Sequence, residues 1–206
     1  MKPRRRPALP LPPDPDLVVI GCSLGGLQAL QKILTRLSDD VDVPIAIAQH
    51  RHRDSSSMLT DVLQRSTRYE VSDAEDQEPI RRGRIFLAPA DYHLLVGDGV
   101  FHLSTEGPVH YSRPSIDLLF ESAAEAFGER LLGILLTGAN RDGASGAMRI
   151  RRAGGGMLVQ DPKTAEAPAM PTAAIEEGAA TRVLLLEEIA EAIDSCCVRR
   201  ESEGVR

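Results

Sequence analysis

The chain has 206 residues, of which 42% are hydrophobic and 26% are charged. These values are typical of one soluble globular domain of ordinary size. The formal net charge is -6, and aromatic residues make up only 3% of the chain. This balance argues against nucleic acid as the main partner. No apolar run is long enough to cross a bilayer, so we expect no membrane insertion.

Residues 1–16 are rich in proline, and their basic residues flank no apolar segment of a signal peptide. We predict a disordered or extended leader there, because prolines remove backbone hydrogen-bond donors. The basic residues could contact an acidic partner, but a solvated tail is the simpler interpretation. Residues 195–206 are predicted to form a C-terminal tail, which leaves one folded domain at residues 17–194.

The segment from Leu17 to Leu30 combines a buried strand, a serine between glycines and the start of a helix. Leu17 to Ile20 are all apolar, as in a parallel strand that is covered on both faces. Gly21 to Gly26 then form a turn that exposes the Ser23 hydroxyl beside backbone N–H groups, which suits a nucleophile for acyl transfer. Apolar residues follow at helical spacing: Leu27, Leu30, Ile33, Leu34 and Leu37.

A glycine-rich turn that opens a helix can also bind phosphate groups or serve only as a turn. The dinucleotide-binding pattern, counted from Gly21, would need a second glycine where Ser23 stands, and no Gly-Lys-Ser/Thr sequence follows. The turn alone leaves these interpretations open. Cys22 is another candidate nucleophile, but strand alternation points it away from the face that Ser23 serves. We therefore interpret Cys22 as a small buried residue.

Strands and helices alternate along the rest of the chain. We predict strands at Ile45 to Ala48, Tyr69 to Val71, Arg84 to Ala88, His93 to Val96, Val100 to Leu103, Leu131 to Thr137, Gly156 to Gln160 and Arg182 to Leu185. Helices are predicted at Ser55 to Leu63, Ser115 to Phe127, from Gly143, at Pro171 to Glu177 and at Glu187 to Asp194. The four short strands between residues 69 and 103 suggest an antiparallel hairpin region. The whole pattern predicts a three-layer α/β/α fold with a doubly wound, mostly parallel, Rossmann-like sheet.

Polar residues that directly follow apolar strands mark a candidate site, because ligands of such sheets bind beyond the carboxyl ends of the strands. Ser23 follows the first strand, His50 ends the second and Asp142 follows the strand from Leu131. An imidazole can take the proton of a serine hydroxyl, and a carboxylate can fix the tautomer of the imidazole and stabilise its charge. The order Ser, His, Asp differs from that of the α/β-hydrolases. We predict that the three side chains converge with the imidazole in the middle.

Other residues compete for these roles. Asp117 and Asp161 are alternatives to Asp142, and Asp142 could serve only as the N-cap of the helix that starts near Gly143. His50 is favoured because an apolar strand delivers it to the expected edge, unlike the other histidines: His52, His93, His102 and His110.

The three cysteines, Cys22, Cys196 and Cys197, have no metal-ligand spacing and no even-numbered disulfide framework. A reducing cytoplasm is therefore the simplest compartment for this chain.

Several further motifs occur between residues 17 and 194: Gly21-Cys22-Ser23-Leu24-Gly25-Gly26, Gln49-His50, Ala88-Pro89-Ala90-Asp91-Tyr92-His93, Arg113-Pro114-Ser115-Ile116-Asp117, Leu136-Thr137-Gly138 with Asp142-Gly143, and Met170-Pro171. Together they resemble the catalytic domain of CheB-type chemotaxis methylesterases. The serine, histidine and aspartate of that family fall on Ser23, His50 and Asp142. The resemblance implies hydrolysis of glutamate γ-methyl esters on the cytoplasmic helices of methyl-accepting chemoreceptors or of a similar methylated protein. Deamidation of receptor glutamines is implied as a related activity.

The resemblance also implies a mechanism without a metal or other cofactor. His50 deprotonates Ser23, and the serine attacks the ester carbonyl. Backbone N–H groups of Leu24 and Ala139 then hold the developing oxyanion. The oligomeric state is not set by the sequence.

The chain departs from the family pattern in ways that affect its expected substrate and regulation. Family members usually carry a phosphorylatable receiver domain ahead of the esterase, so we expect a stand-alone catalytic domain without phosphorylation control in cis. The residues after His50 are basic where the family commonly has an apolar residue and a proline. Four arginines are predicted to form a basic rim for acidic receptor helices, with ordinary solvated surface as the alternative: Arg51, Arg53, Arg113 and Arg141. A non-catalytic adaptor that binds acidic helices is the alternative function, although it would not need all three site residues.

Overall fold

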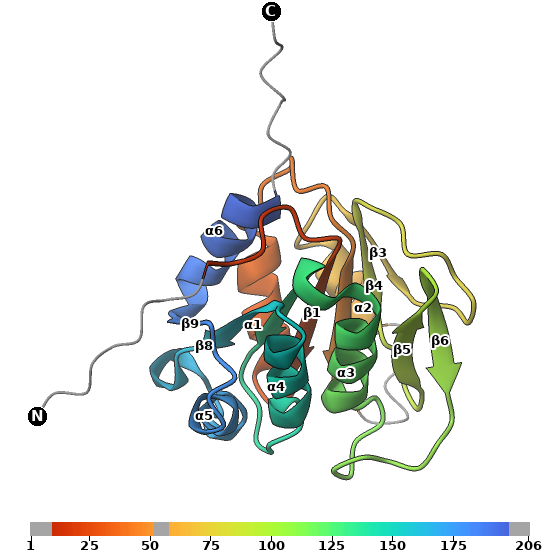
Figure 1. The fold of residues 1–206 in the computed structure, drawn as a ribbon. Helices are drawn as coiled ribbons and strands as arrows, with labels where there is room; N and C mark the ends of the chain where they lie inside the picture. The colour runs from red at the N-terminus through yellow and green to blue at the C-terminus, as the bar shows by residue number, and fades with distance from the viewer. Residues whose placement is uncertain (1–9, 52–57, 198–206) are drawn as a thin grey trace, which may run out of the picture.

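The computed structural model describes residues 10–51 and 58–197 of the chain. Figure 1 shows strands and helices that alternate along most of the described chain. The strands are β1 (Leu17–Cys22), β2 (Ile45–Gln49), β3 (Glu70–Asp73), β4 (Arg84–Leu87), β5 (His93–Gly97), β6 (Val100–Ser104), β7 (Leu131–Leu135), β8 (Gly156–Gln160) and β9 (Arg182–Leu184). The α-helices are α1 (Gly26–Leu34), α2 (Met58–Gln64), α3 (Ile116–Phe127), α4 (Ala144–Arg152), α5 (Ala169–Glu176) and α6 (Leu186–Cys197).

Seven of these strands form one sheet in the order β3-β4-β2-β1-β7-β8-β9, and all of its neighbouring strands are parallel. The sheet grows outward from β1 in both directions, through β2 on one side and β7 on the other. The carboxyl ends of β1, β2 and β7 therefore lie side by side at the point where the strand order switches. This is the place where doubly wound sheets bind their ligands.

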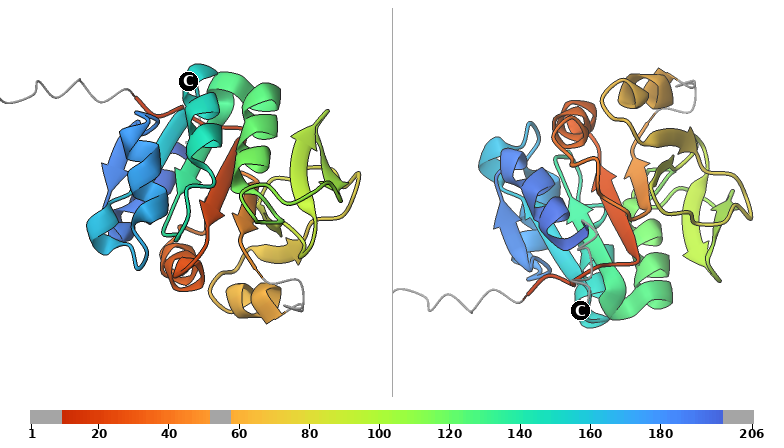
Figure 2. Two further views of the ribbon diagram at one scale, coloured as in Figure 1. Left: turned by 90° about the horizontal axis from the view of Figure 1, so that it is seen from below. Right: turned by 90° about the horizontal axis from the view of Figure 1, so that it is seen from above.

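Helices cover both faces of the sheet (Figure 2). The alternation of strand side chains explains why β1 is apolar throughout: Val18 and Ile20 pack into the cluster that contains α1 and α6. Leu17 and Val19 pack into the opposite cluster, which contains α3, α4 and α5. The three-layer prediction is confirmed, and the two clusters hold the carboxyl edge of β1 between helices on both sides.

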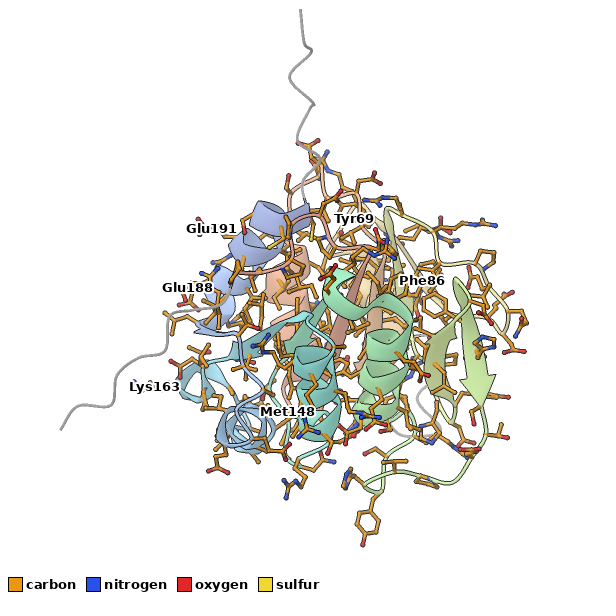
Figure 3. All side chains as sticks on the ribbon, viewed as in Figure 1. Tyr69, Phe86, Met148, Lys163, Glu188 and Glu191 are labelled. Atoms are coloured by element: carbon orange, nitrogen blue, oxygen red, sulfur yellow. The ribbon has the colours of Figure 1, made fainter. Side chains whose placement is uncertain are left out.

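A separate antiparallel hairpin of β5 and β6 lies beside α3. The Phe86 ring of β4, labelled in Figure 3, packs against Phe101 of β6 with ring centroids 4.8 Å apart. This contact joins the hairpin to the main sheet. The predicted hairpin region extended over β3 and β4 as well, and that part was wrong. Both strands pair in parallel within the main sheet, because β4 is buried against β2 through Ile85, Phe86 and Leu87.

The structure describes parts of both predicted terminal segments. Residues 10–16 of the predicted leader form no helix or strand, and the backbone N–H groups of Asp14 and Asp16 donate to the carbonyls of Cys196 and Arg130. Residues 1–9 of the predicted leader lie outside the described residues. At the other end, α6 continues through Cys197, which is buried, so the predicted tail begins after it among residues that the structure does not describe. Within the described ranges, no helix is both long and apolar enough to span a bilayer.

Candidate active site

The turn between β1 and α1 presents Ser23 at the carboxyl edge of the sheet. Gly25 adopts a φ of +78°, and a side chain there would collide with Glu166, so both the conformation and the space call for glycine. The Ser23 carbonyl accepts the N–H of Gly26 at 2.8 Å, which closes the turn into the helix. The neighbouring Cys22 is fully buried, and that burial raises the pKa of its thiol. Cys22 is therefore a poor nucleophile, as the sequence indicated.

Ser23 and His50 are neighbours across two adjacent strands. Cys22 of β1 is in register with Gln49 of β2, and the next residues along the two strands are Ser23 and His50. The backbone N–H of His50 donates to the Cys22 carbonyl at 3.0 Å, which extends this register past the strand end. Both residues line one pocket of about 600 Å³ together with Asp91, Tyr111 and Ser112, among others.

Asp142 lies beneath His50 and is fully buried. Its Oδ2 atom accepts the His50 Nε2–H at 2.7 Å and the backbone N–H of Ile116 at 2.8 Å. Its Oδ1 atom accepts the Ser115 hydroxyl at 3.0 Å and the backbone N–H of Asp117 at 3.1 Å. These backbone donors belong to the first turn of α3, where helical N–H groups lack partners within the helix and favour negative charge. Asp142 thus caps α3, whereas the following helix α4 begins at Ala144 with Gly143 as its N-cap and has no side-chain cap.

The pKa values of two adjacent carboxyls move in opposite directions. Burial favours the neutral form of Asp142, but the hydrogen bonds from His50, Ile116 and Asp117 outweigh it and lower the pKa of this carboxyl. Burial and, to a smaller extent, the charge of Asp142 raise the pKa of Asp117 to about 6, although the hydrogen bond from the Gly146 N–H partly offsets them. Asp142 is therefore ionised at neutral pH, and of the two carboxyls Asp117 takes up a proton first as the pH falls.

The hydrogen bonds of the imidazole fix the roles of its two ring nitrogens. An ionised Asp142 can only accept, so the Nε2 atom of His50 carries the hydrogen. In the neutral ring Nδ1 then has the lone pair, and it lies 3.2 Å from the Ser112 hydroxyl. Among the described residues, the Ser23 hydroxyl makes no hydrogen bond to either ring nitrogen. The structure thus joins His50 to Asp142 and places Ser23 in the same pocket, with Ser112 at the position that Ser23 was predicted to hold.

Thr137 fixes the backbone around Ser23 and was not singled out as a support by the sequence. Its carbonyl accepts the N–H of Ser23 at 2.9 Å, and its hydroxyl donates to the Leu24 carbonyl at 2.9 Å. The same hydroxyl accepts the N–H of Ala167 at 2.8 Å. The two expected oxyanion donors, the N–H groups of Leu24 and Ala139, have no acceptor among the described residues. Both residues are exposed to solvent.

Replacing Thr137 with valine keeps its shape and removes the hydroxyl. We expect the free energy of unfolding to fall by about 1–3 kcal/mol, because a buried N–H and a carbonyl lose their partner. We also expect slower hydrolysis of a reporter ester, because the Leu24 peptide is no longer held. Urea unfolding and ester kinetics measure the two effects. Thr137→Ser retains the hydroxyl and is the control; equal losses in both variants would contradict this role.

The predicted basic rim does not form among the described residues. Arg51 and Arg113 line the pocket, but carboxylates hold both of them. The Nη2 atom of Arg51 lies 2.7 Å from the Asp73 carboxylate, and the Arg51 side chain is only 5% exposed. Arg113 binds Asp91. Arg141 pairs with Glu177 and does not line the pocket, and Arg53 lies outside the described residues.

The competing histidines have other surroundings. His93 is fully buried; its Nδ1 accepts the N–H of Ser115, and its Nε2 donates to the Gly107 carbonyl, both at 3.1 Å. It therefore supports the start of α3. His102 of β6 forms a hydrogen bond with Gln77, and His110 lines the pocket with its Nε2 atom 3.5 Å from the Asp117 carboxylate. His52 lies outside the described residues.

Asp117→Asn tests the electrostatics around Asp142. A carboxyl whose pKa is raised in the folded state stabilises the fold below its unfolded pKa of about 4, and this contribution is lost as the pH rises through about 6. An asparagine keeps the oxygen that accepts the Gly146 N–H at 2.7 Å. We expect Asp117→Asn to raise the free energy of unfolding at pH 8 by about 1–3 kcal/mol and by less at pH 5. Urea unfolding at both pH values measures this, with the turn variant Asp98→Asn as control. Equal gains at both pH values would contradict the assignment.

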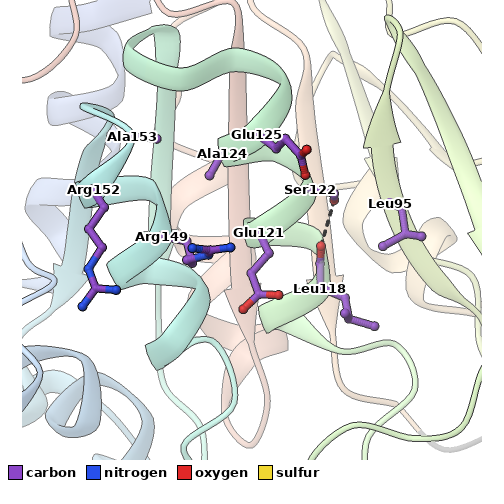
Figure 4. A pocket seen from close by; sticks show the side chains of 9 residues that line it. All are labelled: Leu95, Leu118, Glu121, Ser122, Ala124, Glu125, Arg149, Arg152 and Ala153. Carbon is purple, nitrogen blue, oxygen red and sulfur yellow. Dashed lines mark hydrogen bonds between the residues drawn. The ribbon is translucent and has the colours of Figure 1, made fainter.

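A second groove, between α3 and α4, is lined, among the residues that the structure describes, by no histidine or cysteine that could act as a base or nucleophile. Figure 4 shows Glu121 and Arg149 in the space between the two helices. The Ser122 hydroxyl in this groove is occupied, because it donates to the Leu118 carbonyl at 2.8 Å and accepts the N–H of Val96 at 3.1 Å. Elsewhere too, the described part of the chain contains no cluster of His, Cys, Asp or Glu arranged for a metal ion.

Comparisons with known proteins point to one family. A family model described as CheB methylesterase matches residues 18–193. A relative from Leptospira interrogans is 43% identical over 85% of this chain and 92% of its own length. Protein-glutamate methylesterase/protein-glutamine glutaminase 2 from Anaeromyxobacter dehalogenans is 44% identical over 86% of this chain, which spans only 52% of that relative. The catalytic domain of the Thermotoga maritima CheB methylesterase superimposes with a TM-score of 0.83 at 32% identity, covering 87% of this chain and 97% of that domain.

Proposed function

Because the chain belongs to the CheB methylesterase family, we propose that it removes methyl esters from glutamate side chains of methyl-accepting chemoreceptors through Ser23, His50 and Asp142. Deamidation of glutamine side chains is the related activity, as the names of relatives state for those proteins. The single observation that carries the proposal is the hydrogen bond between His50 Nε2 and the buried Asp142 carboxylate, beside a pocket that also contains Ser23.

The proposed reaction uses Nδ1 of His50 as the base, because Nε2 is bound to Asp142. Nδ1 takes the proton of Ser23 as its Oγ attacks the γ-carbonyl of the ester. The tetrahedral intermediate collapses, and methanol leaves with the proton from His50. A water molecule then attacks the acyl-serine with His50 again as the base, which releases glutamate and restores Ser23.

The oxyanion is proposed to bind the N–H groups of Leu24 and Ala139. Thr137 supports this role, because its two hydrogen bonds, from the Ser23 N–H and to the Leu24 carbonyl, fix the peptide groups that flank the Ser23–Leu24 peptide. An oxyanion donor of this kind contributes about 2.7–4 kcal/mol to transition-state binding in serine hydrolases. The backbone conformation around these N–H groups therefore affects the reaction rate nearly as much as the catalytic side chains do.

The proposed partner is a methylated helix of a chemoreceptor or of a similar protein in the cytoplasm. The three cysteines are free thiols in the structure, which fits a reducing compartment. Domains are proposed as predicted, with the catalytic domain over residues 17–194.

The direct test is methanol release from a methylated chemoreceptor fragment mixed with the purified chain. We expect release in the absence of added metal, and none from a receptor whose methylated glutamates have been replaced by aspartate. A chain that binds the receptor but releases no methanol would support the adaptor instead. The adaptor is not favoured, because a binding surface has no use for a buried carboxylate that holds an imidazole.

A further inference from the structure

The base lone pair of His50 is already occupied in the free protein. Its Nδ1 atom lies 3.2 Å from the Ser112 hydroxyl, while the Asp142 carboxylate holds the other ring nitrogen at 2.7 Å. In the neutral ring Nδ1 can only accept, so Ser112 donates its hydrogen to the atom that must deprotonate Ser23. Two serines therefore share one pocket with this base, and the structure pairs the base with Ser112, which does not belong to the β1–α1 turn.

The segment that carries Ser112 is firmly held. The N–H of Val109 donates to the Ser112 carbonyl at 3.1 Å, and the N–H of Ser112 donates back to the Val109 carbonyl at 2.8 Å. This tight turn has His110 and Tyr111 at its centre, both with positive φ. Such a conformation is uncommon for residues other than glycine, and it persists where the surroundings maintain it.

Arg113 provides much of that support. Its guanidinium binds the Asp91 carboxylate and donates to the carbonyls of Thr105 and Glu106 at 2.7 and 2.9 Å. Arg113 thus ties both ends of the segment from Thr105 to Arg113 to the pocket wall. The Tyr111 side chain, next to Ser112, is fully exposed to solvent.

We propose that Ser112 is a positioning residue that keeps the His50 base engaged in the free protein, so that Ser23 is activated only after the Ser112 hydroxyl releases Nδ1. This inference rests on the proposed function. Because Tyr111 is exposed beside Ser112, a protein substrate that contacts Tyr111 acts directly on the turn that holds the base. His50 can then deprotonate Ser23 when a substrate is bound.

The test is the rate at which a small fluorophosphonate modifies Ser23 in the free protein. In this reaction the Ser23 oxygen bonds to phosphorus, fluoride leaves and the serine proton passes to Nδ1. Ser112→Ala frees the lone pair, and we expect it to raise the second-order rate about three- to tenfold, the range for loss of one competing hydrogen bond. Ser112→Thr keeps a hydroxyl and should restore the slow rate.

Ser104→Ala is the matched control, because Ser104 lies at the end of β6 and its hydroxyl accepts the N–H of Glu106. An unchanged or lower rate in Ser112→Ala, with the adduct still on Ser23, would overturn the role of Ser112 and leave the proposed function intact. An adduct on Ser112 in the wild type would instead overturn Ser23 as the nucleophile. Peptide mass mapping separates these outcomes, and faster modification of Ser23 supports the inference.

Discussion

Ser23→Ala is expected to abolish ester hydrolysis, with turnover lower by about 10⁴-fold or more. The variant retains the pocket, His50 and Asp142, but it lacks the only atom that can form the acyl intermediate in the proposed reaction. Because the Ser23 side chain is only half-buried and bonds neither ring nitrogen, the free energy of unfolding should change by less than about 0.5 kcal/mol.

Methanol release and urea unfolding, measured on the same preparation, separate loss of chemistry from loss of fold. Cys22→Ala is the control on the neighbouring position. It creates a small buried cavity but leaves the nucleophile in place, so it should lower stability more than Ser23→Ala does and retain turnover. Substantial turnover in Ser23→Ala would exclude Ser23 as the nucleophile.

Asp142→Asn is expected to lower turnover by about 10⁴-fold, the effect of the same change in a serine protease. The amide replaces one carboxylate oxygen, so its NH₂ group faces a donor, either on the side of His50 and Ile116 or on the side of Ser115 and Asp117. The imidazole loses the partner that fixes its tautomer and stabilises its charged form.

Asp142 should also affect stability, unlike Ser23. Asp142→Ala leaves the first turn of α3 and the Ser115 hydroxyl without an acceptor, and we expect a loss of about 3–5 kcal/mol. Because the folded pKa of Asp142 is lowered, its contribution is present above the unfolded pKa of about 4 and is lost as the pH falls below it. Asp161→Ala is the matched control, since Asp161 follows β8 but caps only a short turn through the N–H of Lys163. Losses of equal size in the two variants would contradict the role of Asp142 in holding α3.

The parallel sheet and the candidate site could be predicted from the sequence because both depend on short, contiguous residue patterns. Continuous apolar runs mark buried strands, and the polar residues that end them reach one edge of the sheet. That reasoning predicts that Ser23, His50 and Asp142 lie at one edge, and the structure joins His50 to Asp142 and has Ser23 and His50 in one pocket. The motif with Arg113 and Ser115 was visible only as part of a family resemblance, and the structure explains it: Ser115 binds Asp142, and Arg113 ties down the segment beside His50.

The remaining features depend on partners that are distant in the chain. The sequence offered α4 as the helix that Asp142 caps, but the cap is on α3, whose start lies 26 residues earlier at Ile116. The three rim arginines that the structure describes meet carboxylates up to 36 residues away, as Arg141 meets Glu177. Ser112 carries no local signal, because a serine ahead of an Arg-Pro pair is ordinary in a loop. Only the fold brings these groups into contact.

The most direct measurement of the central claim is the site and rate of fluorophosphonate modification in the wild type and in His50→Ala. If His50 activates Ser23, peptide mass mapping will find the adduct on Ser23, and the rate will fall by about 10²-fold or more when the imidazole is removed. Equal rates in the two proteins, or an adduct that is absent from Ser23, would contradict the assignment of this edge of the sheet as a serine hydrolase site.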